Sequence, residues 1–176
     1  QDYKTSIEIT IITDEDTYRG SIFAYITGNP GPEDSVYEKK KSMLSKVNTE
    51  RTSQGAGALR YNPDLEKAAM RHAQDSAQNQ LSGHIGSDGS TAEDRVLDSG
   101  YAVNSHQTGS TLYGENAAQN DGGTVDDVFQ GWVNSTEGHY ETMIDPAYEE
   151  TGFGIAYDES GIEYWVQVFG FNPNNQ

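Results

Sequence analysis

The stretch Gly131-Trp-Val-Asn-Ser-Thr-Glu-Gly-His-Tyr140 decides how the rest of this sequence is interpreted. It closes a predicted helix that begins after Thr124, where two aspartates in the first turn suit the positive end of the helix dipole. Gly138 then predicts a turn that presents His139 close to Glu137. The stretch therefore predicts a helix that packs on a core, followed by a turn that carries polar chemistry. The apolar face of that helix is Val125, Val128, Phe129, Trp132 and Val133.

Two earlier stretches also place an ionisable residue beside glycine. Ser82-Gly-His-Ile-Gly-Ser-Asp-Gly89 offers His84, and Tyr113-Gly-Glu-Asn-Ala117 offers Glu115. Imidazoles and carboxylates are the groups that proteins use as general acids, general bases and metal ligands. We therefore predict one polar cleft whose candidate catalytic residues are His84, Glu115, Glu137 and His139.

Helix and strand signals elsewhere indicate an α+β fold. Helices are predicted from after Pro32-Glu-Asp-Ser35 to about Thr52, from Asn62 to Gln80 and over 92–98. Runs at 152–157 and 162–169 flank a turn and predict a hairpin, so helices precede an antiparallel sheet. The second helix has the most regular apolar face. Its predicted inner residues are Leu65, Ala68, Ala69, His72, Ala73, Ser76 and Ala77, and we interpret His72 as a hydrogen-bonded core histidine.

The first 32 residues differ from the rest of the chain. Alternating isoleucines around Glu8 and a β-rich run at 21–27 predict an antiparallel hairpin, and Gly28-Asn-Pro-Gly-Pro32 predicts a linker. We therefore divide the chain into an N-terminal β-hairpin arm with its linker, residues 1–32, and a main domain, residues 33–176. His106 falls in a polar loop and is interpreted as a solvated residue.

Composition narrows the class of protein. The net charge of −17, from 28 acidic and 11 basic residues, repels phosphate backbones and anionic membranes, so nucleic acid is excluded as a partner. No run of about 20 apolar residues exists to span a bilayer. There is no cysteine, which excludes disulfides and thiolate chemistry. The chain begins at Gln1 rather than Met. Removal of a signal segment would produce such a start, and so would shortening of the chain. On the first interpretation we expect a secreted protein.

Five stretches in one order carry a family resemblance. Residues Met43–Arg51, the helix at 62–80 with Ser82-Gly-His84, and Gly114-Glu-Asn-Ala-Ala118 resemble the CAP superfamily (cysteine-rich secretory protein, antigen 5, pathogenesis-related). The stretch Trp132–His139 and the final hairpin resemble its bacterial, SCP-like branch, with one extra residue before the glycine. The resemblance covers roughly residues 42–170.

The resemblance implies a three-layer α-β-α sandwich with a central antiparallel sheet. It also implies a cleft with two histidines and two acids that binds a divalent metal, often zinc. His84, His139 and Glu115 match by position and are the predicted metal ligands, with Glu115 either ligating, holding a water or orienting an imidazole. The second acid of eukaryotic relatives falls on Ser135 here, and Glu137 is the candidate substitute. Asn116, Trp132 and Ser135 are predicted binding residues, and the alternative to a metal site is a purely structural His/Glu network.

For function, the resemblance implies a secreted domain that binds an extracellular ligand or the cell wall, the ligand being a peptide, a glycan or a lipid. The competing hypothesis is a metal-dependent or acid-base hydrolase of peptides or glycans in the same cleft. Ser87 and Ser135 are conceivable nucleophiles, although both more simply cap turns. Neither Gly-x-Ser-x-Gly nor His-Glu-x-x-His occurs, so no familiar hydrolase signature favours the second hypothesis.

Overall fold

The computed structural model describes residues 32–101 and 113–171. The chain divides into two units, residues 1–38 and 39–176, and the account below concerns the second. The hairpin predicted at 1–28 and His106 lie outside the described residues. None of the helices in the described ranges is long and apolar enough to cross a membrane.

The helices begin and end close to their predicted positions. Asn62 caps α2 by accepting hydrogen bonds from the amides of Asp64 and Leu65, while Thr91 and Thr124 form capping boxes at the starts of α3 and α4. Three elements were not predicted: the short strand β1, the strand β2 and the helix α5. The elements in order are α1 (Pro32–Ser53), β1 (Arg60–Tyr61), α2 (Pro63–Asn79), α3 (Ala92–Asp98), β2 (Tyr113–Asn120), α4 (Val125–Val133), α5 (His139–Ile144), β3 (Glu150–Tyr157) and β4 (Glu163–Gly170).

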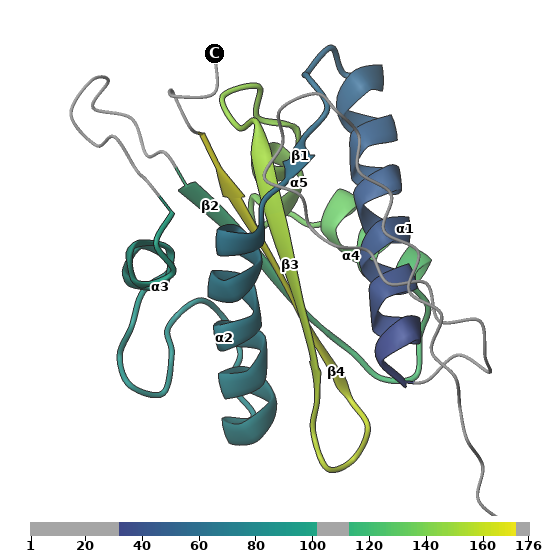
Figure 1. Ribbon diagram of the computed structural model, residues 1–176. Coiled ribbons are helices and arrows are strands. Elements are labelled where there is room, and N and C mark those ends of the chain that lie inside the picture. The colour runs from purple at the N-terminus through teal and green to yellow at the C-terminus, as the bar shows by residue number, and fades with distance from the viewer. Residues whose placement is uncertain (1–31, 102–112, 172–176) are drawn as a thin grey trace, which may run out of the picture. The chain divides into compact units, whose positions relative to one another are not determined.

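The four strands form one sheet in the order β1-β3-β4-β2. The hairpin β3–β4 is antiparallel as predicted, and β2 pairs antiparallel with β4, whereas the short β1 runs parallel to β3. Helices α2 and α3 cover one face, and α4 and α5 lie on the other face with the later turns of α1 (Figure 1). The predicted three-layer α-β-α sandwich is confirmed, and β2 lies at one edge of its sheet.

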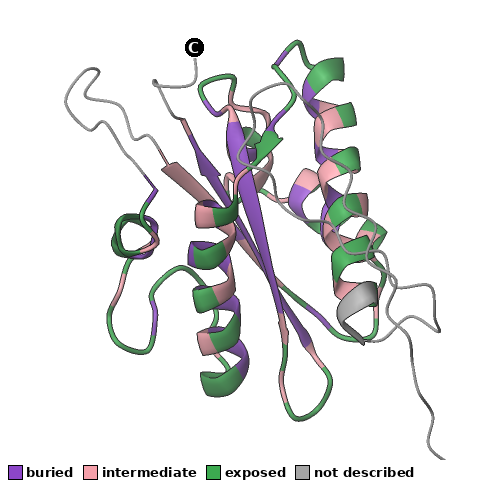
Figure 2. Cartoon of the chain, in the orientation of Figure 1, coloured by how far each residue is buried: buried purple, intermediate pink, exposed green. Residues whose placement is uncertain are grey.

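Two glycines of β3 let α2 lie directly on the sheet. A Cβ atom at Gly152 would lie 2.1 Å from the Glu66 amide nitrogen, and one at Gly154 would lie 2.3 Å from the Ala69 carbonyl oxygen, so no side chain fits. All seven residues predicted for the inner face of α2 are buried, and buried residues concentrate in β3 and β4 (Figure 2). The cluster at this interface is Leu65, Ala68, Ala69, Ala73, Val96, Tyr101, Val166 and Val168.

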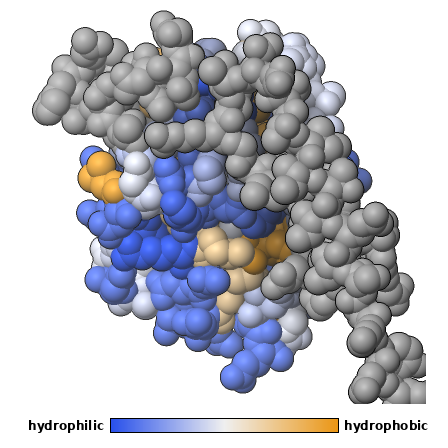
Figure 3. Space-filling model, viewed as in Figure 1, coloured by the Kyte–Doolittle hydropathy of each residue, from blue (hydrophilic) through white to orange (hydrophobic). Residues whose placement is uncertain are grey.

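A buried arginine holds the opposite layer together. Arg51, in the last turn of α1, has no exposed surface, and its guanidinium donates to the carbonyls of Gly57, Met143, Asp145 and Tyr148 at 2.8–2.9 Å. One side chain therefore joins the end of α1 to the segment between α5 and β3. The outer surface is mostly polar, and the face in Figure 3 is largely hydrophilic where it is described, in keeping with a mean hydropathy of −0.77.

Candidate functional site

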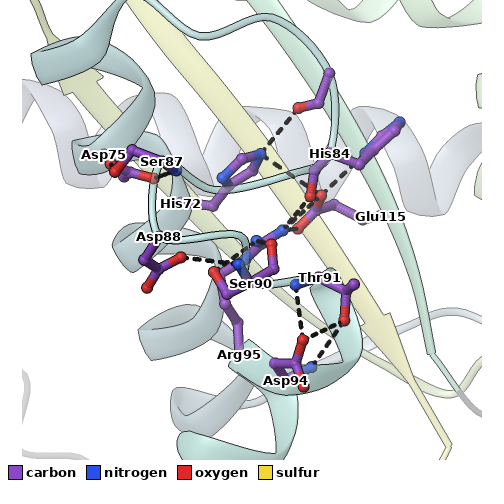
Figure 4. A network of polar contacts seen from close by, with 11 residues as sticks. His72, Asp75, His84, Ser87, Asp88, Ser90, Thr91, Asp94, Arg95 and Glu115 are labelled. Atoms are coloured by element: carbon purple, nitrogen blue, oxygen red, sulfur yellow. Dashed lines mark hydrogen bonds and ion pairs between the residues drawn. The ribbon is translucent and has the colours of Figure 1, made fainter.

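Glu115 is the centre of a buried ion-pair network. It lies on the α2 face of β2, and its side chain is only 3% exposed. Its Oε1 accepts from His84 Nδ1 at 2.9 Å, and both carboxylate oxygens accept from Arg95 Nη2 of α3 at 2.8 and 3.0 Å (Figure 4). Because Arg95 is itself buried, the carboxylate is neutralised inside the protein rather than by solvent.

The loop that carries His84 is fixed on both sides. Arg95 donates to the carbonyls of His84 and Ser90, and Asp75 of α2 accepts from the Ser87 amide at 2.7 Å and from its hydroxyl. The Ser87 hydroxyl thus holds the loop to α2 (Figure 4). His84 is consequently held in place although its side chain is 49% exposed.

His139 reaches the same region from the other face of the sheet. It is the first residue of α5, and Gly138 before it adopts the left-handed φ of 87° that the turn requires. Its Nδ1 lies 2.7 Å from Ser135 Oγ, which also accepts from the Glu137 amide. Asn116 of β2 donates to the His139 carbonyl at 3.0 Å. The stretch from Ser135 to Gly138 thus forms a compact turn that sets the orientation of the imidazole.

The two imidazoles meet at the edge of β2. Their ring centroids are 6.5 Å apart, and each ring uses Nδ1 for a neighbouring side chain, which leaves both Nε2 atoms without a protein partner among the described residues. They border a cavity of about 590 Å³, a volume in the usual range of ligand sites. Its lining comprises Ser76, Leu81, Ser82, Gly83, Ala117, Ala118, Gln119, Glu137, Tyr164, Trp165 and Val166 besides the two histidines.

The two histidines have opposite pKa shifts. The hydrogen bond to Glu115 outweighs burial and raises the pKa of His84 above its ordinary value. Burial, followed by the charge of nearby His84, lowers the pKa of His139, and Glu137 opposes this only partly. Burial alone would raise the pKa of Glu115, but the hydrogen bonds from His84 and Arg95 and the charge of Arg95 bring that pKa below its ordinary value. The carboxylate of Glu115 therefore stays ionised to lower pH than usual, and the His84 imidazole keeps its proton to higher pH than the His139 imidazole does.

A pH titration followed by histidine NMR resonances is expected to show His84 titrating above 6.5 and His139 below it. The contribution of His84 to stability is complete below its unfolded-state pKa and is lost as pH rises through its higher folded-state pKa. His139 acts oppositely, because its lowered pKa favours unfolding as pH falls below the unfolded-state value. The variant His84→Asn should move the pKa of His139 upward, and a wild-type titration with His139 above His84 would contradict this assignment.

The predicted residues take different positions around the cavity. His84, His139 and Glu137 line it, and Glu137 is exposed. Trp132 and Asn116 are buried, and the Trp132 indole donates to the Ala117 carbonyl at 3.3 Å, so both act from behind the surface. His72 is fully buried with Nε2 at 2.9 Å from the Gly83 carbonyl, which confirms the core interpretation.

Two functional residues were missed, Arg95 and Asp75. The sequence offers one signal for Arg95, which lies in a short predicted helix next to the apolar Val96. An arginine on the apolar side of a helix needs a buried partner. Asp75 gave no signal, because it is one acid among 28.

The donor set at the cleft suits zinc, although it is small. Zinc favours imidazole nitrogen, and a hydrogen bond to the other ring nitrogen is the usual way to orient such a ligand. His84 and His139 both satisfy this condition. No group of three or more His, Asp or Glu residues arranged around a common point is found in residues 32–101 and 113–171.

The three-layer sandwich with two imidazoles at one edge of its sheet defines a class of small α+β domains. The chain belongs to the cysteine-rich secretory protein family, CAP, whose model matches residues 44–169. The chain itself contains no cysteine. No curated protein matches it.

Solved structures share this fold at low sequence identity. An outer surface protein from Borrelia burgdorferi is 23% identical with a TM-score of 0.62, over 76% of this chain and 92% of that one. An extracellular protein containing a SCP domain from Bacillus anthracis is 20% identical with a TM-score of 0.65, over 83% of this chain but 45% of its own length. NaASP2 with Zn²⁺ is 18% identical with a TM-score of 0.51, over 76% of this chain and 79% of that one. The chain thus spans less than half of the Bacillus protein.

Proposed function

We propose that this domain is an extracellular binding module whose cleft takes up a divalent cation, Zn²⁺, together with an extracellular ligand. The proposal rests on one observation: both imidazoles are oriented in the same way. Nδ1 of His84 contacts Glu115 and Nδ1 of His139 contacts Ser135, which leaves each Nε2 available for a ligand. A structural network alone would not require two rings from opposite faces of the sheet to meet at a cavity.

The location and the cation are also supported by the similar structures. One is described as an extracellular protein and another as an outer surface protein, and NaASP2 was solved with Zn²⁺. A strongly acidic chain is compatible with a secreted, highly soluble domain and attracts cations.

Within this proposal the histidines are the ligands and Glu115 orients one of them. Both oxygens of Glu115 accept from Arg95, and Oε1 also accepts from His84, so this carboxylate fixes the ring and strengthens its basicity. A bound Zn²⁺ supplies Lewis acidity at the cleft. With two protein ligands the expected affinity is modest, well below that of structural sites with four.

Two of the candidate catalytic groups, Glu115 and Ser135, are already engaged in holding the cleft together. A general acid or base needs a carboxylate or imidazole within reach of the substrate and able to change its protonation state. Glu115 is tied to Arg95, and Ser135 already accepts from the Glu137 amide and contacts Nδ1 of His139. Hydrolysis therefore stays the second hypothesis, tested by a peptide and glycan screen.

Calorimetric titration of chelator-treated protein with ZnCl₂ tests the proposal. We expect about one equivalent bound by the wild type and at least a tenfold loss of affinity in His84→Ala and in His139→Ala. Above the folded-state pKa of His84, both should unfold much like the wild type in urea, because neither side chain is buried in the core. His106→Ala serves as the matched control for loss of an imidazole outside the proposed pair.

Full zinc affinity in either cleft variant contradicts the proposal, as does an equal loss in the control. Zinc should also raise the midpoint of thermal unfolding of the wild type, by the linkage between binding and folding, and leave both cleft variants unchanged.

A further inference from the structure

The hydrogen-bond pattern of the sheet shows which backbone groups of β2 face away from β4. The Gly170 carbonyl accepts from the Glu149 amide, so Gly170 turns its backbone groups toward β3. Residues alternate sides along an antiparallel ladder, so the odd-numbered residues of β4 turn toward β2, where they pair with even-numbered residues such as Asn116 and Ala118. The N–H and C=O groups that face outward, here called the outer edge of β2, belong to Tyr113, Glu115, Ala117 and Gln119.

Part of the outer edge is already used by side chains. The Tyr113 carbonyl accepts from the Tyr148 hydroxyl at 3.0 Å and the Ala117 carbonyl from the Trp132 indole at 3.3 Å. The amides of Ala117 and Gln119 donate to no acceptor within residues 32–101 and 113–171. Unpaired strand edges are templates for pairing with another extended segment, and these amides form such a template.

The cavity lies along this part of the edge. Its lining includes Ala117, Ala118 and Gln119 of this strand, His84 and the loop before it from one helical layer, and Glu137 and His139 from the other. Alanine side chains are small and add little bulk beside an approaching second backbone. From Glu115 to Gln119 the strand extends roughly 13 Å at about 3.3 Å per residue, long enough to pair with a short peptide.

We propose that the cleft binds an extended, basic peptide that adds a strand to the outer edge of β2. The proposal rests on the proposed function, namely that this cleft binds a ligand, and it specifies the ligand class. Main-chain pairing with Ala117 and Gln119 supplies the affinity, as in other strand-addition complexes. The basic character follows from charge: the cavity lining carries the exposed carboxylate of Glu137, Glu115 is neutralised internally, and the net charge of −17 stays strongly negative even with one Zn²⁺ bound.

An array of hexapeptides tests this proposal with defined probes. Lysine is fixed at two alternate positions and the other four are varied, and a second array replaces lysine with glutamate. We expect binders among the lysine peptides, with affinity that falls as salt rises, and none among the glutamate peptides. An array without lysine binders, or equal binding by both sets, overturns the proposal.

The strongest lysine peptide is then N-methylated at alternate amides in two complementary sets. A strand turns only every second amide toward its partner, so one set should weaken binding at least tenfold and the other should leave it within about threefold. Equal effects of the two sets overturn strand pairing. This measurement needs no change in the protein.

The protein-side test is Ala117→Pro, which removes an outward amide and no ladder bond; proline is tolerated at such edge positions. Its affinity for the peptide should fall at least tenfold, and its affinity for zinc should equal that of the wild type. Ala118→Pro is the matched control that removes a ladder bond to β4, and it should lower the urea midpoint much more. Loss of zinc binding by both histidine variants with no peptide binding anywhere would refute strand addition and leave the proposed function standing. Concentration-dependent dimers abolished by Ala117→Pro, with no peptide bound, would assign the edge to a second copy and overturn the proposal.

Discussion

Replacement of Arg51 by methionine is expected to lower the free energy of unfolding by about 3 kcal/mol or more, since each buried polar group left without its partner costs about 1–3 kcal/mol. The guanidinium serves four carbonyls at the junction of α1, α5 and β3. Methionine fills similar volume and donates nothing, so four acceptors lose a donor, and the carbonyls of Met143 and Tyr148 lose theirs in fully buried contacts. Burial also lowers the pKa of this arginine, and methionine removes that desolvation cost, which offsets only part of the loss.

Urea denaturation of the whole chain measures this effect, with Arg60→Met as the control. Arg60 pairs with Glu149 at the surface, with its side chain 43% exposed, and pairs of this kind contribute roughly 0–1 kcal/mol. Arg51→Lys should fall between the two, because a lysine ammonium cannot reproduce the planar arrangement of donors. Equal midpoints for Arg51→Met and Arg60→Met would show that the four carbonyl contacts do not stabilise the junction.

Replacement of Glu115 by alanine is expected to cost about 3–5 kcal/mol, the usual effect of removing one partner from a buried ion pair. Arg95 would keep its charge in a position with 1% exposure and lose its only carboxylate within the described residues. The same change removes the acceptor for His84 Nδ1. The pKa of His84 should therefore fall toward its ordinary value, and zinc affinity should drop even at temperatures where the protein is folded.

The double variant Glu115→Leu with Arg95→Met separates charge from packing. Because it leaves no isolated charge, it should be more stable than Glu115→Ala and Arg95→Met are separately, as buried pairs replaced together often are. Its zinc affinity should nevertheless stay low, because His84 still lacks its acceptor. If the double variant loses as much free energy of unfolding as the two single variants lose together, the pairing of Glu115 with Arg95 is contradicted.

The elements that could be predicted were those whose signals are local. Asn62 followed by Pro63 marks the start of α2, and the spacing of its small apolar residues predicts its buried face. The strand β2 has the sequence Tyr-Gly-Glu-Asn-Ala-Ala-Gln-Asn, which has no β-branched residue and no apolar alternation, so only pairing with β4 makes it a strand. The helix α5 has six residues, too few for a periodic signal, and it exists because Gly138 turns the chain onto the sheet.

The same distinction between local signals and long-range contacts applies to the candidate site. The meeting of His84, Glu115 and His139 was expected from the order of the family motifs, since spacing alone cannot join residues 55 positions apart. The place of Arg95 on the apolar side of its helix indicates a buried partner but does not identify Glu115 as that partner, because Arg95 reaches the carboxylate only after α3 folds onto β2. Trp132 and Asn116 belong to the motifs but act from the buried side, a distinction that residue type does not carry.

The position of the imidazoles on opposite sides of one strand has a mechanical consequence. His84 belongs to the layer of α2 and α3, and His139 to the layer of α5. A ligand that contacts both rings therefore connects the two helical layers at the edge of the sheet. While it is bound, it restricts movement of one layer relative to the other. Occupancy of the cleft should then slow amide hydrogen exchange in the His84 loop and in α5 together. A small ligand would thus stiffen two segments that lie far apart in the sequence.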